Sequence, residues 1–238
     1  MNRRVSAMLA QIEAFLASHV DPVFAAGQQG FFRDSVPTCG VRTVHVNELV
    51  RLVYREVKKW EVADRDQLME ALWKTRKLEP GVVVCHVYRR FGKSFGAREF
   101  DLFESWLERY VTNWAHSDGL SSWLLAACIG NQPELRHRLP PWTKSGNRWK
   151  RRAAAVSLLH EAKRGRHLED VLAMAARLLK DRDDMVEKGV GWLLKEAYPA
   201  RPREVVEFLS RHGREATRLT LRYAAEKMTP ADRARVLG

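Results

Sequence analysis

Apolar residues recur every three to four positions over most of the chain, which is the spacing of one face of an α-helix. Two clear series are Val5, Met8, Leu9, Ile12 and Leu16, and then Leu49, Leu52, Val53 and Val57. The same spacing predicts helices over residues 64–75, 80–93, 99–112, 120–130, 148–162, 167–180, 185–197, 202–211, 215–227 and 230–237. No stretch alternates strictly enough to predict a strand. The pattern therefore predicts an all-α fold.

Residues 81–85, Gly-Val-Val-Val-Cys, have the β-branched composition that is typical of a strand. The residues that follow, His86, Tyr88, Arg89 and Arg90, nevertheless continue the segment at helical spacing. We therefore predict a buried helix here.

Short breaks that contain Gly, Pro or Asp separate the predicted helices, for example near Asp64, residues 79–81, Gly96, residues 117–119 and residues 229–230. About twelve helices in pairs of roughly 35 to 45 residues match the HEAT or armadillo period. We expect a single domain over residues 1–238, with an irregular helical part over 1–45 and stacked helix pairs over 46–238. Such a stack is a right-handed α-solenoid with a concave surface.

The chain is strongly basic, with 41 Lys and Arg against 29 Asp and Glu and a formal net charge of +12. Residues 141–238 carry 22 basic and 13 acidic side chains, whereas residues 1–140 carry 19 and 16. This charge indicates a polyanionic partner, for which we favour nucleic acid over an anionic membrane surface. We expect the concave surface to be basic, mainly in its second half.

The three cysteines, Cys39, Cys85 and Cys128, are far apart and show no CxxC or paired-His spacing. Neither a zinc site nor a redox motif is indicated, so we expect no metal and no cofactor. No apolar run approaches the ~18 residues that span a bilayer, and the N-terminus lacks a signal-peptide pattern. We expect a cytoplasmic monomer without a membrane partner.

The segment 113–118, NWAHSD, combines an aromatic residue and a carboxylate at the junction between two predicted helices. Trp114 and Asp118 are four positions apart and share a face if they lie on a helical turn. If Asp118 is instead an N-cap, the Trp still lies against it. A capping Asp beside a packing Trp is the structural alternative to a functional pair.

The segment 146–155, GNRWKRRAAA, runs basic and aromatic residues into small apolar ones. Its candidates for DNA contact are Arg148, Trp149, Lys150, Arg151 and Arg152, because guanidinium forks suit phosphate oxygens. A solvated basic helix face is the alternative.

The segment 187–196, EKGVGWLLKE, places two glycines in a predicted helix. Each glycine costs about 1 kcal/mol relative to Ala, which indicates close approach by another backbone or a ligand. Trp192, one position later, is a candidate for the site, with core packing as the alternative.

In this order and spacing, NWAHSD, NRWKRRAA and EKGVGWLLKE resemble the AlkD-like family of bacterial DNA alkylation repair glycosylases, most clearly over residues 100–210. Asp118 and Arg152 are 34 positions apart, and Arg152 and Trp192 are 40 apart. Each interval is about one HEAT repeat, so the three residues would project from equivalent helices onto one surface.

The resemblance implies a role for each residue. The family's active-site Trp and Asp fall on Trp114 and Asp118, its phosphate-binding Arg on Arg152 and its second cleft Trp on Trp192. The family's active-site Tyr aligns with Phe31, which lacks the hydroxyl. An aromatic wall would remain there. The best-known members have Asp where this chain has Ala115, and this departure bears on lesion range and rate more than on the reaction itself.

This chemistry suits the residue types. A purine alkylated at N3 or N7 is already cationic, so it leaves as a neutral base without protonation by a general acid. Asp118 would oppose an oxocarbenium-like sugar and orient the attacking water. Trp114 and Trp192 would hold the cation through cation–π contacts, about 0.5 to 2 kcal/mol each. The resemblance adds that the base is not drawn into a deep pocket.

Two other functions fit the same composition. One is a non-catalytic HEAT-like protein that recognises bent or damaged DNA, and the other is a helical-repeat protein scaffold. Asp118 favours the glycosylase over the first, because a carboxylate that faces phosphates weakens binding unless it acts on the lesion. The second predicts no salt-sensitive DNA affinity. We therefore predict excision of cationic alkylated purines from duplex DNA.

Overall fold

The computed structural model describes residues 2–238, and these residues form helices joined by short loops, with one isolated bridge between Val20 and Val41. The α-helices are α1 (Arg3–Ser18), α2 (Pro22–Gln28), α3 (Thr43–Val57), α4 (Val62–Lys74), α5 (Leu78–Tyr88), α6 (Ala97–Arg109), α7 (Trp114–Gly119), α8 (Ala126–Asn131), α9 (Arg148–Val156), α10 (Leu159–Lys163), α11 (Leu168–Leu178), α12 (Asp184–Ala197), α13 (Pro202–His212), α14 (Arg218–Ala224) and α15 (Pro230–Leu237). The all-α prediction is confirmed.

Short turns of other helix types connect or extend these helices. They are the 3₁₀ turns η1 (Gln29–Phe31), η2 (Arg89–Ser94), η4 (Pro133–Arg138), η5 (Pro140–Lys144), η6 (Gly213–Glu215) and η7 (Ala225–Lys227), and the π-helical η3 (Leu120–Leu125). α7, η3 and α8 follow one another directly and form one continuous helix from Trp114 to Asn131. η2 extends α5 in the same way.

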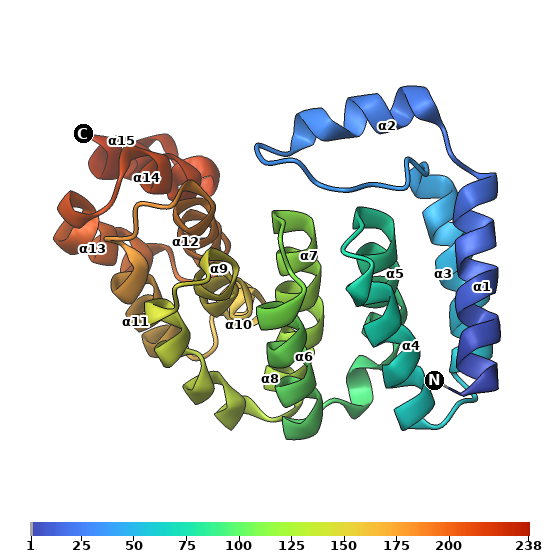
Figure 1. Ribbon diagram of the computed structural model, residues 1–238. Coiled ribbons are helices and arrows are strands. Elements are labelled where there is room, and N and C mark those ends of the chain that lie inside the picture. The colour runs from blue at the N-terminus through green and yellow to red at the C-terminus, as the bar shows by residue number, and fades with distance from the viewer. Residues whose placement is uncertain (1) are drawn as a thin grey trace.

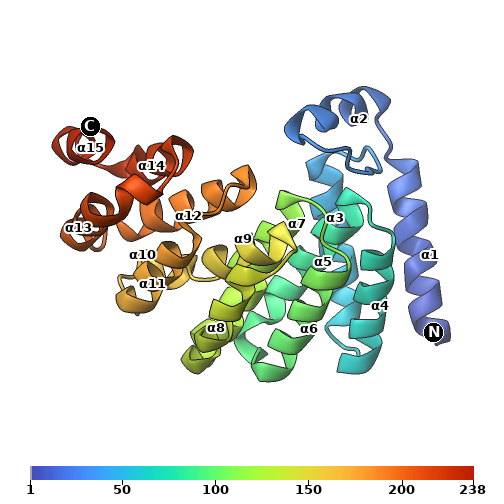
Figure 2. The same ribbon diagram turned by 60° about the vertical axis from the view of Figure 1, so that its left-hand side comes forward.

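Six helices form a continuous row through the molecule, and we call it the central row. α3 packs on α5, α5 on α7, α7 on α9, α9 on α12 and α12 on α14. The elements between them lie beside the row, and the chain proceeds from α1 at one end to α15 at the other (Figures 1 and 2). Each helix of the row thus meets its counterpart from the preceding and following pair.

Polar contacts between successive pairs have a nearly constant spacing in sequence. The bonded partners are 31 to 36 positions apart in five such contacts: Glu104–Arg138, Arg136–Asp170, Arg148–Asp184, Glu196–Lys227 and Tyr198–Asp232. A constant offset of this kind arises when similar units stack one after another. The protein has a helical-repeat fold, while the handedness of the stack and a concave basic surface stay predictions.

Local predictions from periodicity mostly hold. In α1 the buried residues are Val5, Met8, Ile12 and Leu16, four of the five in the predicted series. The β-branched segment 81–85 lies in α5 and is buried except at Val82, so the buried helix is confirmed. Because its two sides pack on α3 and α7, the segment needs no alternation of apolar and polar residues.

Three predicted boundaries are wrong. The predicted break at residues 79–81 lies inside α5, which begins at Leu78. The helix does not break at residues 117–119, because the backbone remains helical from α7 into η3. The predicted helix 148–162 is divided instead, since α9 ends at Val156 and α10 begins at Leu159.

The N-terminal segment after α1 leaves the stack and returns to it. α2 projects from the N-terminal end across the ends of α5 and α7, and the chain then runs back towards α3 (Figure 1). Glu79 of α5 anchors the return, because its buried carboxylate accepts backbone N–H bonds from Cys39 (2.6 Å) and Val41 (3.2 Å). The segment between α2 and this anchor is thereby held over the central row.

Nothing in the described part of the chain has the length and apolarity that a helix needs to cross a membrane.

Candidate active site

The first turn of α7 is fixed by a buried network. Asn113 caps the helix, because its Oδ1 accepts from the backbone N–H of His116 at 2.9 Å. The amide nitrogen of Asn113 lies 3.0 Å from His116 Nδ1, and His116 Nε2 lies 2.9 Å from the carbonyl oxygen of Leu78. The tautomer that satisfies both contacts carries its proton on Nε2. Burial lowers the pKa of His116 to about 4, so the ring is neutral at pH 7.

This network fixes the direction in which the next residues point. Trp114 is the first residue of α7, and Asp118 lies one turn later on the same face. Asn113, and not Asp118, is the N-cap of α7. Of the two arrangements expected from the sequence, the structure therefore has the one in which Trp114 and Asp118 share a helix face. Both side chains are partly exposed.

Asp118 and Arg152 form a bidentate ion pair between neighbouring helices of the central row. Arg152 Nε donates to Asp118 Oδ1 at 2.7 Å, and Arg152 Nη2 donates to Oδ2 at 2.8 Å. The exposed fraction is 17% for the Asp118 side chain and 8% for the Arg152 side chain. The two parallel hydrogen bonds hold the carboxylate in one orientation. Because Asp118 is still partly exposed, solvent can reach its carboxylate.

A third helix completes the cradle around Arg152. Arg152 Nη1 donates to the carbonyl oxygen of Met185 in α12. On the same helix, a Cβ at Gly189 would lie 3.2 Å from Arg152 Cγ, so the glycine makes room for the arginine. Three of the five guanidinium N–H groups are engaged, which leaves one on Nη1 and one on Nη2.

The N-terminal segment covers one side of this site. The ring of Phe32 stacks on Trp114, with centroids 5.6 Å apart and planes 28° apart. Trp114 Nε1 donates to the carbonyl oxygen of Phe31 at 3.2 Å. The Phe31 side chain is 74% exposed, so the aromatic wall beside Trp114 is Phe32 and Phe31 contributes its backbone.

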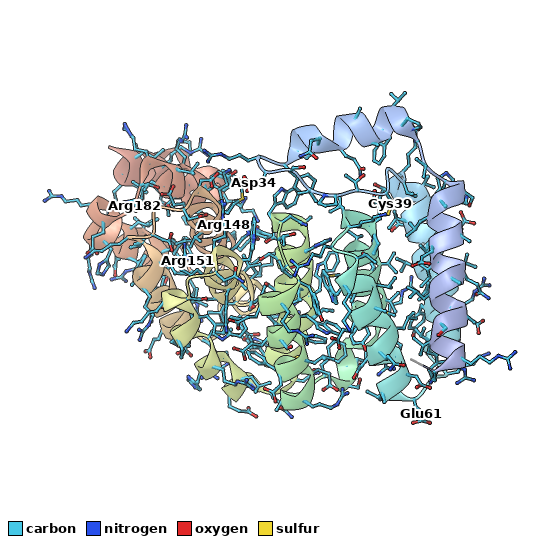
Figure 3. All side chains as sticks on the ribbon, in the orientation of Figure 1. Asp34, Cys39, Glu61, Arg148, Arg151 and Arg182 are labelled. Carbon is cyan, nitrogen blue, oxygen red and sulfur yellow. The ribbon has the colours of Figure 1, made fainter. Side chains whose placement is uncertain are left out.

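Ion pairs tie the same segment to α9 and α12. Asp34 Oδ2 lies 3.5 Å from Arg148 Nη1, and Arg33 Nη1 lies 3.9 Å from Asp184 Oδ1. Figure 3 shows Asp34 on the returning segment beside Arg148 of α9. A small cleft between them is lined by Phe32, Trp114, Arg148, Trp149 and Met185, among others.

Trp192 lies two turns after Met185 on α12 and is partly buried against the core. Its Nε1 donates to Glu196 Oε1 at 3.2 Å. The preceding Gly191 faces α14, where an added Cβ would lie 2.4 Å from Tyr223 Cβ and 2.9 Å from the Thr220 carbonyl oxygen. The predicted close approach by another backbone is confirmed at Gly191, whereas the atoms nearest to Gly189 belong to the side chains of Arg152 and Val156.

The other basic residues of α9 are engaged within the protein. Arg148 contacts Asp183 (2.9 Å) and Asp184 (3.1 Å). Arg151 bonds to Asp181 at 2.6 Å. Lys150 bonds to Glu104 (3.1 Å) and Glu108 (2.7 Å) on the opposite side of the helix.

Trp149 is only 8% exposed and belongs to the hydrophobic core. The three basic residues are thus paired with carboxylates and Trp149 packs in the core, while contact of these four residues with DNA stays a prediction.

The structure therefore brings Trp114, Asp118 and Arg152 together, with Arg148 at the edge of the cleft. Sequence reasoning missed Phe32, the Met185 carbonyl and the role of Gly189 in accommodating Arg152. The double Phe31-Phe32 was the available signal for the first, whereas a backbone carbonyl leaves no signal in the sequence.

A possible set of metal ligands lies at the N-terminal end, apart from this site. Ligand atoms of His19, His45 and Glu48 lie within 4.8 Å of one another. His19 follows α1, and the other two residues lie in the first turns of α3. None of the three contacts the cleft residues described above.

Comparison with known proteins agrees with this architecture. Among solved structures, a protein from Enterococcus faecalis described as a predicted DNA alkylation repair enzyme superposes with a TM-score of 0.80. The match covers 89% of this chain and 98% of that chain at 15% sequence identity, which shows the shared helical-repeat fold. No curated protein matches this sequence.

The family model for DNA alkylation repair enzymes matches residues 12–228. The chain belongs to this family, as its three motifs indicate.

Proposed function

We propose that the protein is a DNA glycosylase that hydrolyses the N-glycosidic bond of cationic N3- or N7-alkylated purines in duplex DNA. The observation that carries the proposal is the bidentate Asp118–Arg152 pair beside Trp114, at the start of two neighbouring helices of the central row. Family membership supports a role in repair of alkylation damage.

Arg152 resolves the difficulty of placing a carboxylate near DNA. In the free protein the Asp118–Arg152 pair has no net charge, so it does not repel a phosphate. A lesion phosphate that binds the two remaining N–H groups of Arg152 would bring the site to a net charge of −1. That charge would face the cationic nucleoside, where it stabilises the developing oxocarbenium ion.

Trp114 supplies a π face for the cation, and Trp192 supplies a second one if DNA brings the lesion against α12. Each contact is worth about 0.5 to 2 kcal/mol, depending on how completely water is excluded. Phe32 stacks on Trp114 in the free protein, so the lesion would use the other face of the indole or displace Phe32. No metal or cofactor takes part in this scheme, because the leaving base is already cationic.

The decisive experiment incubates the purified protein with methylated duplex DNA and measures released 3-methyladenine and 7-methylguanine. We expect release of both bases. Retained DNA binding without release would support the non-catalytic DNA-binding protein instead.

Matched duplexes that carry 7-methylguanine, uracil or 8-oxoguanine test the leaving-group argument. The proposed site offers no general acid for a neutral base, so only 7-methylguanine should be excised. Excision of uracil at a comparable rate would show that an acid acts in the site.

A further inference from the structure

A second group of cationic residues lies on α3 and α5, outside the three motifs. A groove between these helices is lined by Asn47, Val50, Arg51, His86, Arg89 and Arg90. Arg51, Arg89 and Arg90 are exposed, and His86 is partly buried. We call these three arginines the groove cluster. No carboxylate belongs to the lining, so the groove offers hydrogen-bond donors and positive charge to an anion.

The arginines of the groove cluster differ from those of α9 in their partners. Within residues 2–238, no carboxylate oxygen lies within 4.0 Å of their guanidinium nitrogens. Two of them rest on aromatic rings instead: Arg89 lies 4.8 Å from the centroid of Trp123, and Arg90 lies 4.8 Å from that of Tyr54. A ring face restricts a guanidinium group without using its N–H donors, so all five remain available.

Neighbouring groups experience this uncompensated charge. The pKa of His86 is lowered by burial and then by the charges of Arg89 and Arg90. The pKa of His160, on α10, is also lowered, first by burial and then by nearby cations that include Arg164, Lys163 and Arg89. Arg89 is thus a cationic neighbour of both His86 on α5 and His160 on α10.

The groove cluster is connected to the proposed active site by one continuous helix. Trp123, which contacts both His86 and Arg89, lies five residues after Asp118. Five helical residues advance about 7 Å, roughly two base steps of a DNA strand at 3.4 Å each. In η3 the helix widens to a π turn, and Ser122 Oγ donates to the Asp118 carbonyl oxygen at 2.7 Å. This turn fixes Trp123 relative to Asp118.

We propose that Arg51, Arg89 and Arg90 form a phosphodiester-binding site that holds the DNA backbone near the lesion. The proposal rests on the proposed function for its choice of DNA as the polyanion. Free cationic groups release counterions when they bind phosphates, whereas groups already paired with carboxylates contribute little. Each arginine of the groove cluster that binds a phosphate should therefore contribute to the salt dependence of DNA binding.

The test measures the affinity of the full chain for an undamaged, fluorescently labelled duplex at several salt concentrations. The triple variant Arg51→Gln, Arg89→Gln, Arg90→Gln should reduce the slope of log K against log salt by about 2 to 3 units, since each phosphate contact contributes about 0.9. The matched control replaces Arg3, Arg177 and Arg235 by Gln. These exposed residues lie on α1, α11 and α15, outside the central row, and the control removes the same charge.

A third variant carries Lys at the three groove positions and separates lost charge from lost folding. It should keep most of the slope. An unchanged slope in the Gln variant, a loss equal to that of the control, or an equal loss in the Lys variant would each overturn the proposal.

This assay needs no catalysis, so it is independent of the excision experiment. If the wild-type protein releases no base and the Gln variant loses the slope, the glycosylase proposal fails and the phosphodiester site stands. If the protein excises 7-methylguanine and the Gln variant keeps the slope, the glycosylase proposal stands and the phosphodiester site fails.

Discussion

Arginines of α9 and arginines of the groove cluster lie on helices of the same row, but their surroundings differ. Arg148, Arg151 and Arg152 each bond to a carboxylate from another element. Arg89 and Arg90 lie over aromatic rings and have no such partner among residues 2–238. The density of basic residues along a sequence is therefore a poor guide to where positive potential remains, because folding neutralises some clusters and leaves others free.

Removal of one charge should also have different effects on stability and DNA binding in the two regions. Loss of an arginine from an ion pair leaves a carboxylate without its partner and disturbs the fold. Loss of an arginine from the groove cluster leaves no carboxylate unpaired, so DNA binding should fall while stability falls only by the lost cation–π contact, about 0.5 to 1 kcal/mol. Asp118→Asn and Arg151→Gln test this contrast directly.

Asp118→Asn should have the largest effect. Removal of the negative charge should reduce single-turnover excision of 7-methylguanine by a hundredfold or more, about 2.7 to 4 kcal/mol of transition-state stabilisation. Most DNA affinity should remain, but the free energy of unfolding should fall, because Arg152 is 6% exposed and would lose its counter-charge. Excision within threefold of wild type would contradict the assignment.

A double variant separates these two effects. Arg152→Gln combined with Asp118→Asn leaves no unpaired charge, so it should recover part of the lost stability. It should not recover excision. Urea denaturation and single-turnover assays on all four proteins complete the cycle.

His116 links the groove helix α5 to the active-site helix α7, and it should make stability depend on pH. Its pKa is about 4 in the folded protein, below the ordinary value of 6.5, so the unfolded chain binds the proton more readily. The contribution of neutral His116 to the free energy of unfolding is present above pH 6.5. It is lost as the pH falls towards 4, and the loss is up to about 3 kcal/mol. Denaturation curves for the wild type and His116→Gln should converge over this interval, and parallel curves would contradict the prediction.

Gly189 and Gly191 allow a matched comparison on α12. Gly191→Ala should destabilise the protein by about 1 to 3 kcal/mol, because the new methyl group meets the backbone of α14. Gly189→Ala meets only the side chain of Arg152, so its stability should change by less than about 1 kcal/mol. Its excision rate should fall instead, because Arg152 must shift. Thermal unfolding and single-turnover excision would be measured for both, and the opposite ranking in stability would refute this account.

Arg151→Gln should have the smallest effect on DNA binding. Arg151 is paired with Asp181 at 2.6 Å, so its removal should change the salt slope by less than about half a unit. The free energy of unfolding should fall by about 1 kcal/mol or less. A slope change as large as that of Arg89→Gln would show that the ion pair opens when DNA binds, which would remove the contrast between the two regions.

The sequence by itself determined the helices and their repetition. A period of three to four in apolar positions requires one buried helix face, and this requirement is local to each segment. It predicted α1 and the buried α5, and the three motifs indicated the family. The motif spacings of 34 and 40 residues also placed Asp118, Arg152 and Trp192 on successive helices of one row.

Only the tertiary structure decided which charges remain free and which aromatic ring lies against Trp114. Arg152 and Asp118 are 34 positions apart, and Phe32 and Trp114 are 82 apart, so their contacts depend on how the repeats and the N-terminal segment pack. Ion pairing is a property of distances below about 4 Å, which periodicity does not encode. The basic α9 is therefore prominent in the sequence, whereas Arg51, Arg89 and Arg90 become a common surface only when α3 packs against α5.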